Sequence, residues 1–113
     1  MSTEAYICVF KDSHEALAIR VLSDGHPAHT GKLLKQPYSH KDEAKVLINL
    51  GSLRYLQDTL SKDAKQKIDR KCPITITNNR ILNLLDSVDY VYYVGTAGNW
   101  YYVDRELREW AKL

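Results

Sequence analysis

A chain of 113 residues has the length of one ordinary domain, and its 44% hydrophobic and 27% charged residues are typical of a folded globular protein. The formal net charge is only +2, which argues against a strongly basic nucleic-acid binder or a membrane-surface protein. The first residues lack the basic and apolar regions of a secretory signal, and no apolar run approaches the about 20 residues of a membrane span. We therefore expect a cytoplasmic protein without membrane contact, in which Cys8 and Cys72 are reduced and Cys8 is buried in a strand.

The first predicted element is a β-hairpin. Residues 5–11 are apolar on both faces and rich in strand formers, which is typical of a central strand. Residues 12–15 contain Asp12 and Ser13, whose side chains favour turns. Residues 16–22 then alternate in polarity, so the pattern predicts strand, turn and strand.

Residues 23–38 hold two of the five glycines and two of the three prolines, which predicts a loop of about 16 residues with at most a helical turn near Leu33 and Leu34. Loops of this length are often functional. Asp24, His26 and His29 are its candidate site residues, because two histidines three apart can share a metal or, with a carboxylate, act in base catalysis. No further ligands follow at a recognisable spacing, so a turn with solvated histidines is the favoured interpretation.

Three helices are predicted in the middle of the chain. The first runs from an N-cap at Ser39 to a C-cap at Gly51, and the second begins at Ser52 and carries leucines at helical spacing. The third covers residues 61–71, where one helix face would gather three basic residues, Lys67, Arg70 and Lys71. A solvated face is the commoner use of such a cluster, and contact with an acidic partner is the alternative.

Residues 74–77 indicate a short strand, and residues 80–86 a helix. The clearest hairpin follows, with strands over 88–94 and 99–103 around a loop with glycines at both ends. Alternation places Tyr90 and Tyr92 on one face and Tyr93 on the other. A final helix is predicted after Asp104, with Leu107 and Trp110 in its apolar stripe.

The hairpin aromatics are the second group of candidate binding residues. Cross-strand packing explains them most simply, a protein interface is the next alternative, and base stacking is the third. The residues are Tyr90, Tyr92, Tyr93, Trp100, Tyr101 and Tyr102.

The arrangement resembles a group of small uncharacterised phage and prophage proteins. In these, a second strand enters a His-x-Asp-Gly-Tyr-Pro loop, and a Gly-x-Trp turn lies in a C-terminal aromatic hairpin. Here Asp24-Gly25 and Pro27 match the loop, whereas His26 replaces its tyrosine and Leu22 its first histidine. Gly98-Asn99-Trp100 matches the Gly-x-Trp turn. The resemblance brings no established activity. It implies an accessory protein that acts by binding host machinery, for example as an inhibitor of a defence system in the host cytoplasm.

The sequence as a whole predicts a single α+β domain over residues 1–113. A small antiparallel sheet, formed by the N-terminal and C-terminal hairpins, would pack with three to five short helices. The favoured function is non-enzymatic binding of a protein partner through the aromatic hairpin and the 23–38 loop, without cofactor or metal. A homodimer is a further prediction, because a tyrosine-rich edge strand invites pairing. The alternative function is a nucleotide or nucleic-acid module that stacks bases on the hairpin aromatics, with charge from the basic cluster.

Overall fold

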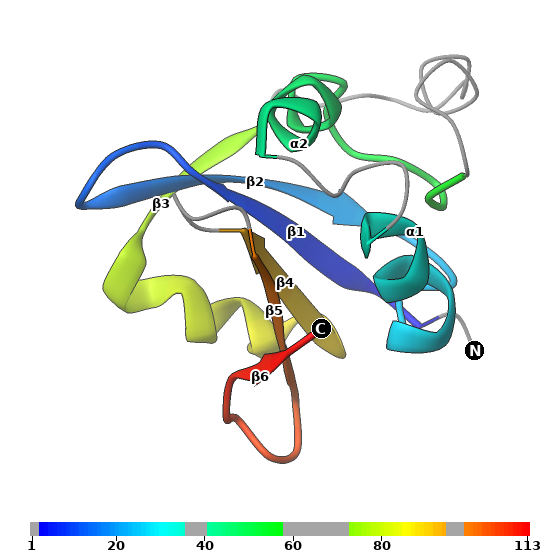
Figure 1. Cartoon of the computed structure of the whole chain (residues 1–113). Coiled ribbons are helices and arrows are strands. Elements are labelled where there is room, and N and C mark those ends of the chain that lie inside the picture. Colours follow the sequence, from blue (N-terminus) through cyan, green and yellow to red (C-terminus); the bar gives the residue numbers. More distant parts are fainter. Residues whose placement is uncertain (1–2, 36–40, 58–72, 95–98) are drawn as a thin grey trace.

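A computed structural model describes residues 3–35, 41–57, 73–94 and 99–113. These residues form an α+β structure around a mixed sheet with strand order β3-β2-β1-β4-β5-β6 (Figure 1). The strands are β1 (Ala5–Phe10), β2 (Glu15–Val21), β3 (Ile74–Thr77), β4 (Tyr90–Val94), β5 (Trp100–Asp104) and β6 (Ala111–Lys112). Both predicted hairpins and the strand at 74–77 are confirmed. The prediction of an antiparallel sheet made from two hairpins alone is wrong, because β1 and β4 are parallel and β3 and β6 extend the sheet at its two edges.

The parallel pair follows from a crossover. β3 is antiparallel to β2, which is antiparallel to β1, so β3 runs in the same direction as β4. Two strands of the same direction cannot be joined by a tight turn. The chain connects them through η2 (Asn78–Asp86), a 3₁₀ helix where the sequence predicts a helix over 80–86.

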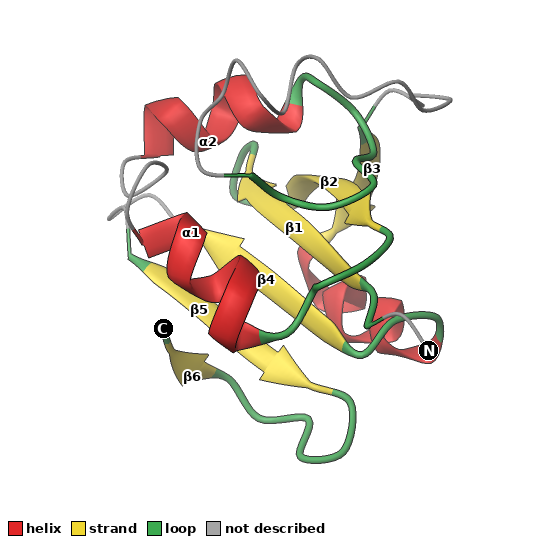
Figure 2. Cartoon of the chain, turned by 90° about the vertical axis from the view of Figure 1, so that its right-hand side faces the viewer, coloured by secondary structure: helices red, strands yellow, loops and turns green. Residues whose placement is uncertain are grey.

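The sheet lies between two helical layers. The helical segments η1 (Pro27–Gly31), a π-helix, α1 (Lys32–Lys35) and α2 (Lys41–Ile48) cover one face, and η2 covers the other (Figures 1 and 2). We call these the α1/α2 face and the η2 face. Within the described part of the predicted 23–38 loop, which ends at residue 35, nine residues are helical, which is more than the single turn expected there. None of the helices in the described residues has the length and apolar character needed to cross a membrane.

Each face of the sheet has its own apolar cluster. On the α1/α2 face, Ile7 and Val9 of β1 pack with helix residues that include Leu34 and Leu47. On the η2 face, Cys8 packs with residues that include Ile81 and Leu85. β1 is buried on both sides, as its continuous apolar run predicts. Cys8 is a buried free thiol, and burial raises its pKa to about 12.

Two predicted helices are wrong, the one that begins at Ser52 and the last one, after Asp104. Ser52 does not begin a helix, because Leu53 forms a β-bridge with Val21 and its N–H donates to the Arg20 carbonyl oxygen at 2.8 Å. β3 pairs only with residues 15–18 of β2. Backbone groups of residues 20–23 instead form hydrogen bonds with Leu53 and Arg54. The charged segment predicted as the third helix lies outside the described residues.

The last predicted helix is a single turn followed by a strand. The carboxylate of Asp104 accepts the Leu107 N–H at 2.7 Å, as an N-cap would. Arg108 then has φ 53°, a left-handed conformation that ends the turn. The chain reverses, and β6 pairs with Tyr101 and Tyr102 of β5.

Candidate binding site

The polar 23–31 loop is fixed to the α1/α2 face of the sheet. The Gly25 N–H donates to the Thr3 carbonyl oxygen at 2.9 Å, and the Gly25 carbonyl oxygen accepts the Tyr92 hydroxyl at 2.7 Å. The hydroxyl of buried Thr30 donates to the Asp24 carbonyl oxygen at 2.6 Å. Asp24 itself has φ 56°, a conformation that Asp tolerates better than most residues. This loop is therefore held by several hydrogen bonds.

The two histidines of this loop have different surroundings. His26 is exposed, as is Asp24, whereas His29 is half-buried and its Nε2 lies 3.0 Å from the Leu56 carbonyl oxygen. A carbonyl oxygen only accepts, so Nε2 carries the proton in this contact. Within the described ranges, no three His, Cys, Asp or Glu side chains gather in a group able to hold a metal ion. The observed role of His29 is to connect the loop to the 52–57 stretch.

The hairpin aromatics are divided between the two faces, as the alternation predicts. Tyr90, Tyr92, Trp100 and Tyr102 belong to the α1/α2 face, and Tyr92 and Trp100 are buried there. The ring of Tyr92 lies 6.5 Å from that of Tyr90 and 6.3 Å from that of Tyr102, measured between centroids. Such aromatic pairs stabilise neighbouring strands. Burial also raises the pKa of Tyr92.

The predicted tyrosine-rich edge does not exist, because β4 and β5 lie inside the sheet and β6 pairs with β5. The loop and the hairpin do converge, through the Tyr92–Gly25 hydrogen bond, but they converge in the core. Most of the predicted binding aromatics are thus placed where they hold the fold together.

Two exposed aromatic residues, Tyr101 and Trp110, lie together on the η2 face. A pocket of about 420 Å³ is lined there by five residues, Asn78, Ile81, Tyr93, Tyr101 and Trp110. We call it the aromatic pocket. Tyr93 and Tyr101 are direct cross-strand partners, and the ring of Trp110 meets that of Tyr93 edge-on at a centroid distance of 6.1 Å. Tyr101 is 37% exposed and Trp110 42% exposed. Desolvation raises the pKa of Tyr93, which lies deeper.

Asn78 connects the pocket to the β1–β2 turn. Its backbone N–H donates to the His14 carbonyl oxygen at 2.8 Å, and its side-chain Nδ2 donates to the Ser13 carbonyl oxygen at 3.2 Å. The other side-chain atom, Oδ1, is buried and has no hydrogen-bond partner in the part of the chain that the structure describes. An unsatisfied buried acceptor is unusual in a folded protein and calls for an explanation.

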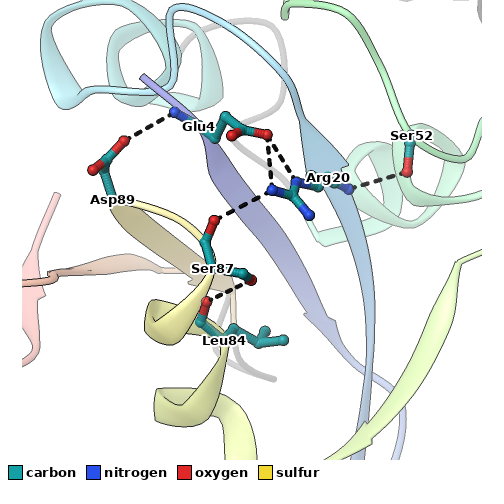
Figure 3. Close-up of polar contacts among 6 residues, drawn as sticks. All are labelled: Glu4, Arg20, Ser52, Leu84, Ser87 and Asp89. Carbon is teal, nitrogen blue, oxygen red and sulfur yellow. Dashed lines mark hydrogen bonds and ion pairs between the residues drawn. The ribbon is translucent and has the colours of Figure 1, made fainter. Parts of the chain in front are cut away.

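A polar network at the other end of η2 holds that helix against the sheet (Figure 3). The Arg20 guanidinium pairs with the Glu4 carboxylate at 2.9 Å and donates to the Ser87 carbonyl oxygen at 3.2 Å. The Glu4 N–H donates to the Asp89 carboxylate at 3.2 Å, and the Tyr6 ring lies 5.8 Å from the Arg20 guanidinium carbon. Because Glu4 and Asp89 flank β1 and β4, this network supports the parallel pairing.

Sequence reasoning missed several of these residues. Nothing in the sequence marked Asn78 or Ile81 as a binding residue, and Trp110 was expected in the apolar stripe of a final helix. Tyr101 could have been separated from Trp100 and Tyr102 by the same alternation that divides the tyrosines of β4. The predicted basic site residues, Lys67, Arg70 and Lys71, lie outside the described residues.

Comparison with known proteins returned no match: none among protein-family models, none among curated proteins and none among solved structures. The resemblance to phage proteins therefore stays a prediction.

Proposed function

We propose that this chain is a non-enzymatic binding protein that engages a protein partner through the aromatic pocket. The observation that supports this most directly is the exposure of Tyr101 and Trp110 beside a hollow in the surface. Exposed Trp and Tyr side chains that line a pocket are the residue types that contribute most binding energy at protein interfaces. The pocket thus provides a surface of the kind that sequence reasoning sought in the hairpin.

The rigidity of the pocket supports the same conclusion. Tyr93 and Tyr101 project from paired interior strands, and Asn78 is tied to the β1–β2 turn by two hydrogen bonds. Side chains already fixed in the free protein lose little conformational entropy when a partner binds.

The resemblance to phage and prophage proteins indicates the kind of partner. We propose a host protein, with a component of a defence system as the first candidate to test. In this proposal the chain acts by occupying a surface of its target, and no residue has a catalytic role.

The test is a comparison of matched variants. Wild-type protein, Tyr101→Ala and Leu107→Ala are used in parallel to capture proteins from the native host, and each candidate is then purified and titrated calorimetrically. Leu107 is 72% exposed and is not among the pocket residues, so Leu107→Ala controls for nonspecific binding to exposed apolar side chains. We expect Tyr101→Ala to weaken binding of the purified partner at least about tenfold, whereas Leu107→Ala leaves it unchanged. Equal binding by all three proteins would contradict the proposal.

Nucleotide binding remains the alternative, and one observation favours it. Lys112 lies directly opposite Tyr101 across the β5–β6 pair, so its side chain shares the η2 face with the aromatic rings. A cation beside stacking aromatics suits a base with its phosphate. Binding of this kind falls steeply with salt, so a titration of a short single-stranded oligonucleotide at two ionic strengths distinguishes it from protein binding.

A further inference from the structure

We infer that the aromatic pocket takes one aromatic side chain of the partner that carries a hydrogen-bond donor, a tryptophan or a tyrosine, and that this donor bonds Asn78 Oδ1. The inference rests on the proposed function, because it names the anchor residue that the partner would insert. It is carried by two independent features, the unsatisfied acceptor and the uncharged aromatic lining.

The orientation of the Asn78 amide is fixed by its neighbour. Nδ2 faces the Ser13 carbonyl oxygen, which only accepts, so the amide cannot be reversed without opposing two acceptors. The oxygen therefore keeps its position and has no hydrogen-bond partner among the residues that the structure describes. A ligand that brings an N–H or O–H group to this oxygen removes an unfavourable feature of the free protein, and a purely apolar ligand does not.

The residues that line the pocket favour an uncharged aromatic ligand. All five lining residues are uncharged, and three of them present aromatic rings that pack well against another ring. A cationic side chain would enter without a compensating carboxylate among the described lining residues, and Lys112 on the same face would repel it. The volume of about 420 Å³ lies within the range of pockets that hold small organic groups and accommodates an indole.

Trp110 is the lining residue that lies outside the helices and strands. Asn78 Oδ1 is buried, so a donor reaches it only if neighbouring atoms shift. Trp110 lies in the irregular stretch before β6 and meets Tyr93 edge-on, whereas Tyr93 and Tyr101 are held within interior strands. The shift of Trp110 upon binding is therefore part of the expected result.

The test is a titration of the ¹⁵N-labelled full chain followed by NMR. The probes are N-acetyltryptophanamide, its 1-methylindole analogue, N-acetylphenylalaninamide, N-acetylargininamide and adenosine. We expect N-acetyltryptophanamide to shift the Trp110 indole N–H and the Asn78 side-chain amide signals. The 1-methylindole analogue has a methyl group in place of the indole N–H proton and cannot donate, and we expect it to bind about three- to tenfold more weakly, as one hydrogen bond implies.

Matched variants locate the binding. Tyr101→Ala should abolish the shifts, Tyr101→Phe should retain them because the ring remains, and Leu107→Ala should titrate like the wild type. Equal affinity for the tryptophan, methylated and phenylalanine probes would overturn the role of the donor. Tighter binding of adenosine or the arginine probe would overturn the proposed occupant, as would the absence of shifts with every probe.

The outcomes separate this inference from the proposed function. If no probe binds but a purified partner still depends on Tyr101, the inference fails and the function stands. If the tryptophan probe binds but partner binding ignores Tyr101→Ala, the function fails and the chemistry of the pocket stands.

Discussion

Replacing Gly25 with alanine tests how the 23–31 loop is fixed to the sheet. A Cβ atom at this position would lie 2.9 Å from the Ala5 Cβ, 2.9 Å from the Thr3 carbonyl oxygen and 3.0 Å from the Ala5 nitrogen. Two of these atoms belong to the backbone, so no side-chain rotation relieves the contact. The loop has to move away from β1, and its hydrogen bonds to Thr3 and Tyr92 would lengthen or break.

The magnitude follows from these contacts. Overpacking at such a site costs about 1–3 kcal/mol, and each weakened hydrogen bond adds about 1 kcal/mol. With two such hydrogen bonds, we expect Gly25→Ala to lower the free energy of unfolding by about 3–5 kcal/mol. At roughly 4 °C per kcal/mol for a chain of this size, the Tm falls by about 12–20 °C.

Gly31→Ala is the matched control. Its Cβ would meet Leu113 Cδ1 at 2.8 Å, but that atom is the end of a flexible side chain and can rotate away. The expected cost is about 1 kcal/mol or less. Urea denaturation of both variants measures the difference, and a larger loss of stability in Gly31→Ala than in Gly25→Ala would contradict the predicted backbone clash at Gly25.

A double-mutant cycle checks the mechanism. Tyr92→Phe leaves the Gly25 carbonyl oxygen without its donor and should cost about 1–2 kcal/mol in the wild type. In the Gly25→Ala background, where that hydrogen bond is already disrupted, the same change should cost less than about 0.5 kcal/mol. Additive effects would show that the loop stays in place and that the destabilisation has another origin.

Three further predictions concern the rest of the fold. Arg20→Lys should destabilise the chain by about 1 kcal/mol in urea, because lysine cannot keep both the carboxylate and the carbonyl contacts and the pair is partly screened; an unchanged midpoint would contradict this. In a Cys72→Ser variant, the Cys8 thiol should resist a disulfide reagent at pH 8 until the protein is denatured, since burial raises its pKa to about 12; rapid native labelling would show an accessible thiol. The pKa values of Tyr90, Tyr92 and Tyr93 are raised in the folded protein, so the unfolded chain loses its phenolic protons first. The free energy of unfolding should therefore fall as the pH rises above about 10, the ordinary phenol pKa. Absorbance titration should show fewer tyrosinates in the native than in the denatured protein at pH 11.

Local features of the chain were predictable because neighbouring residues determine them. The apolar run over 5–11 predicts a strand buried on both faces, and β1 lies at the centre of the sheet. The turn predicted at Asp12 forms through its own side chain, whose carboxylate accepts the His14 and Glu15 N–H groups; these hydrogen bonds also lower the pKa of Asp12. Gly51 follows α2 with φ 80°, as a C-cap glycine does.

The same local signals failed where a distant strand offered backbone hydrogen bonds. The leucine spacing after Ser52 and the cap at Asp104 both indicate helices, yet Leu53 pairs with β2 and Ala111 pairs with β5. In each case the segment satisfies backbone groups of a strand that is remote in sequence, and no local pattern reports that need.

The candidate site also combines a local feature that the sequence predicts with a tertiary feature that it does not. Side chains of a strand point to opposite faces, so the residue order alone predicted that the hairpin aromatics would lie on both faces of the sheet. Which of the two faces stays open to solvent followed only from the packing of distant elements. The 23–31 loop, α1 and α2 cover Tyr92 and Trp100, whereas η2 leaves part of Tyr101 and Trp110 exposed beside Asn78. Burial depends on which distant elements pack on each face, so the pocket became visible only when the strands and helices were assembled.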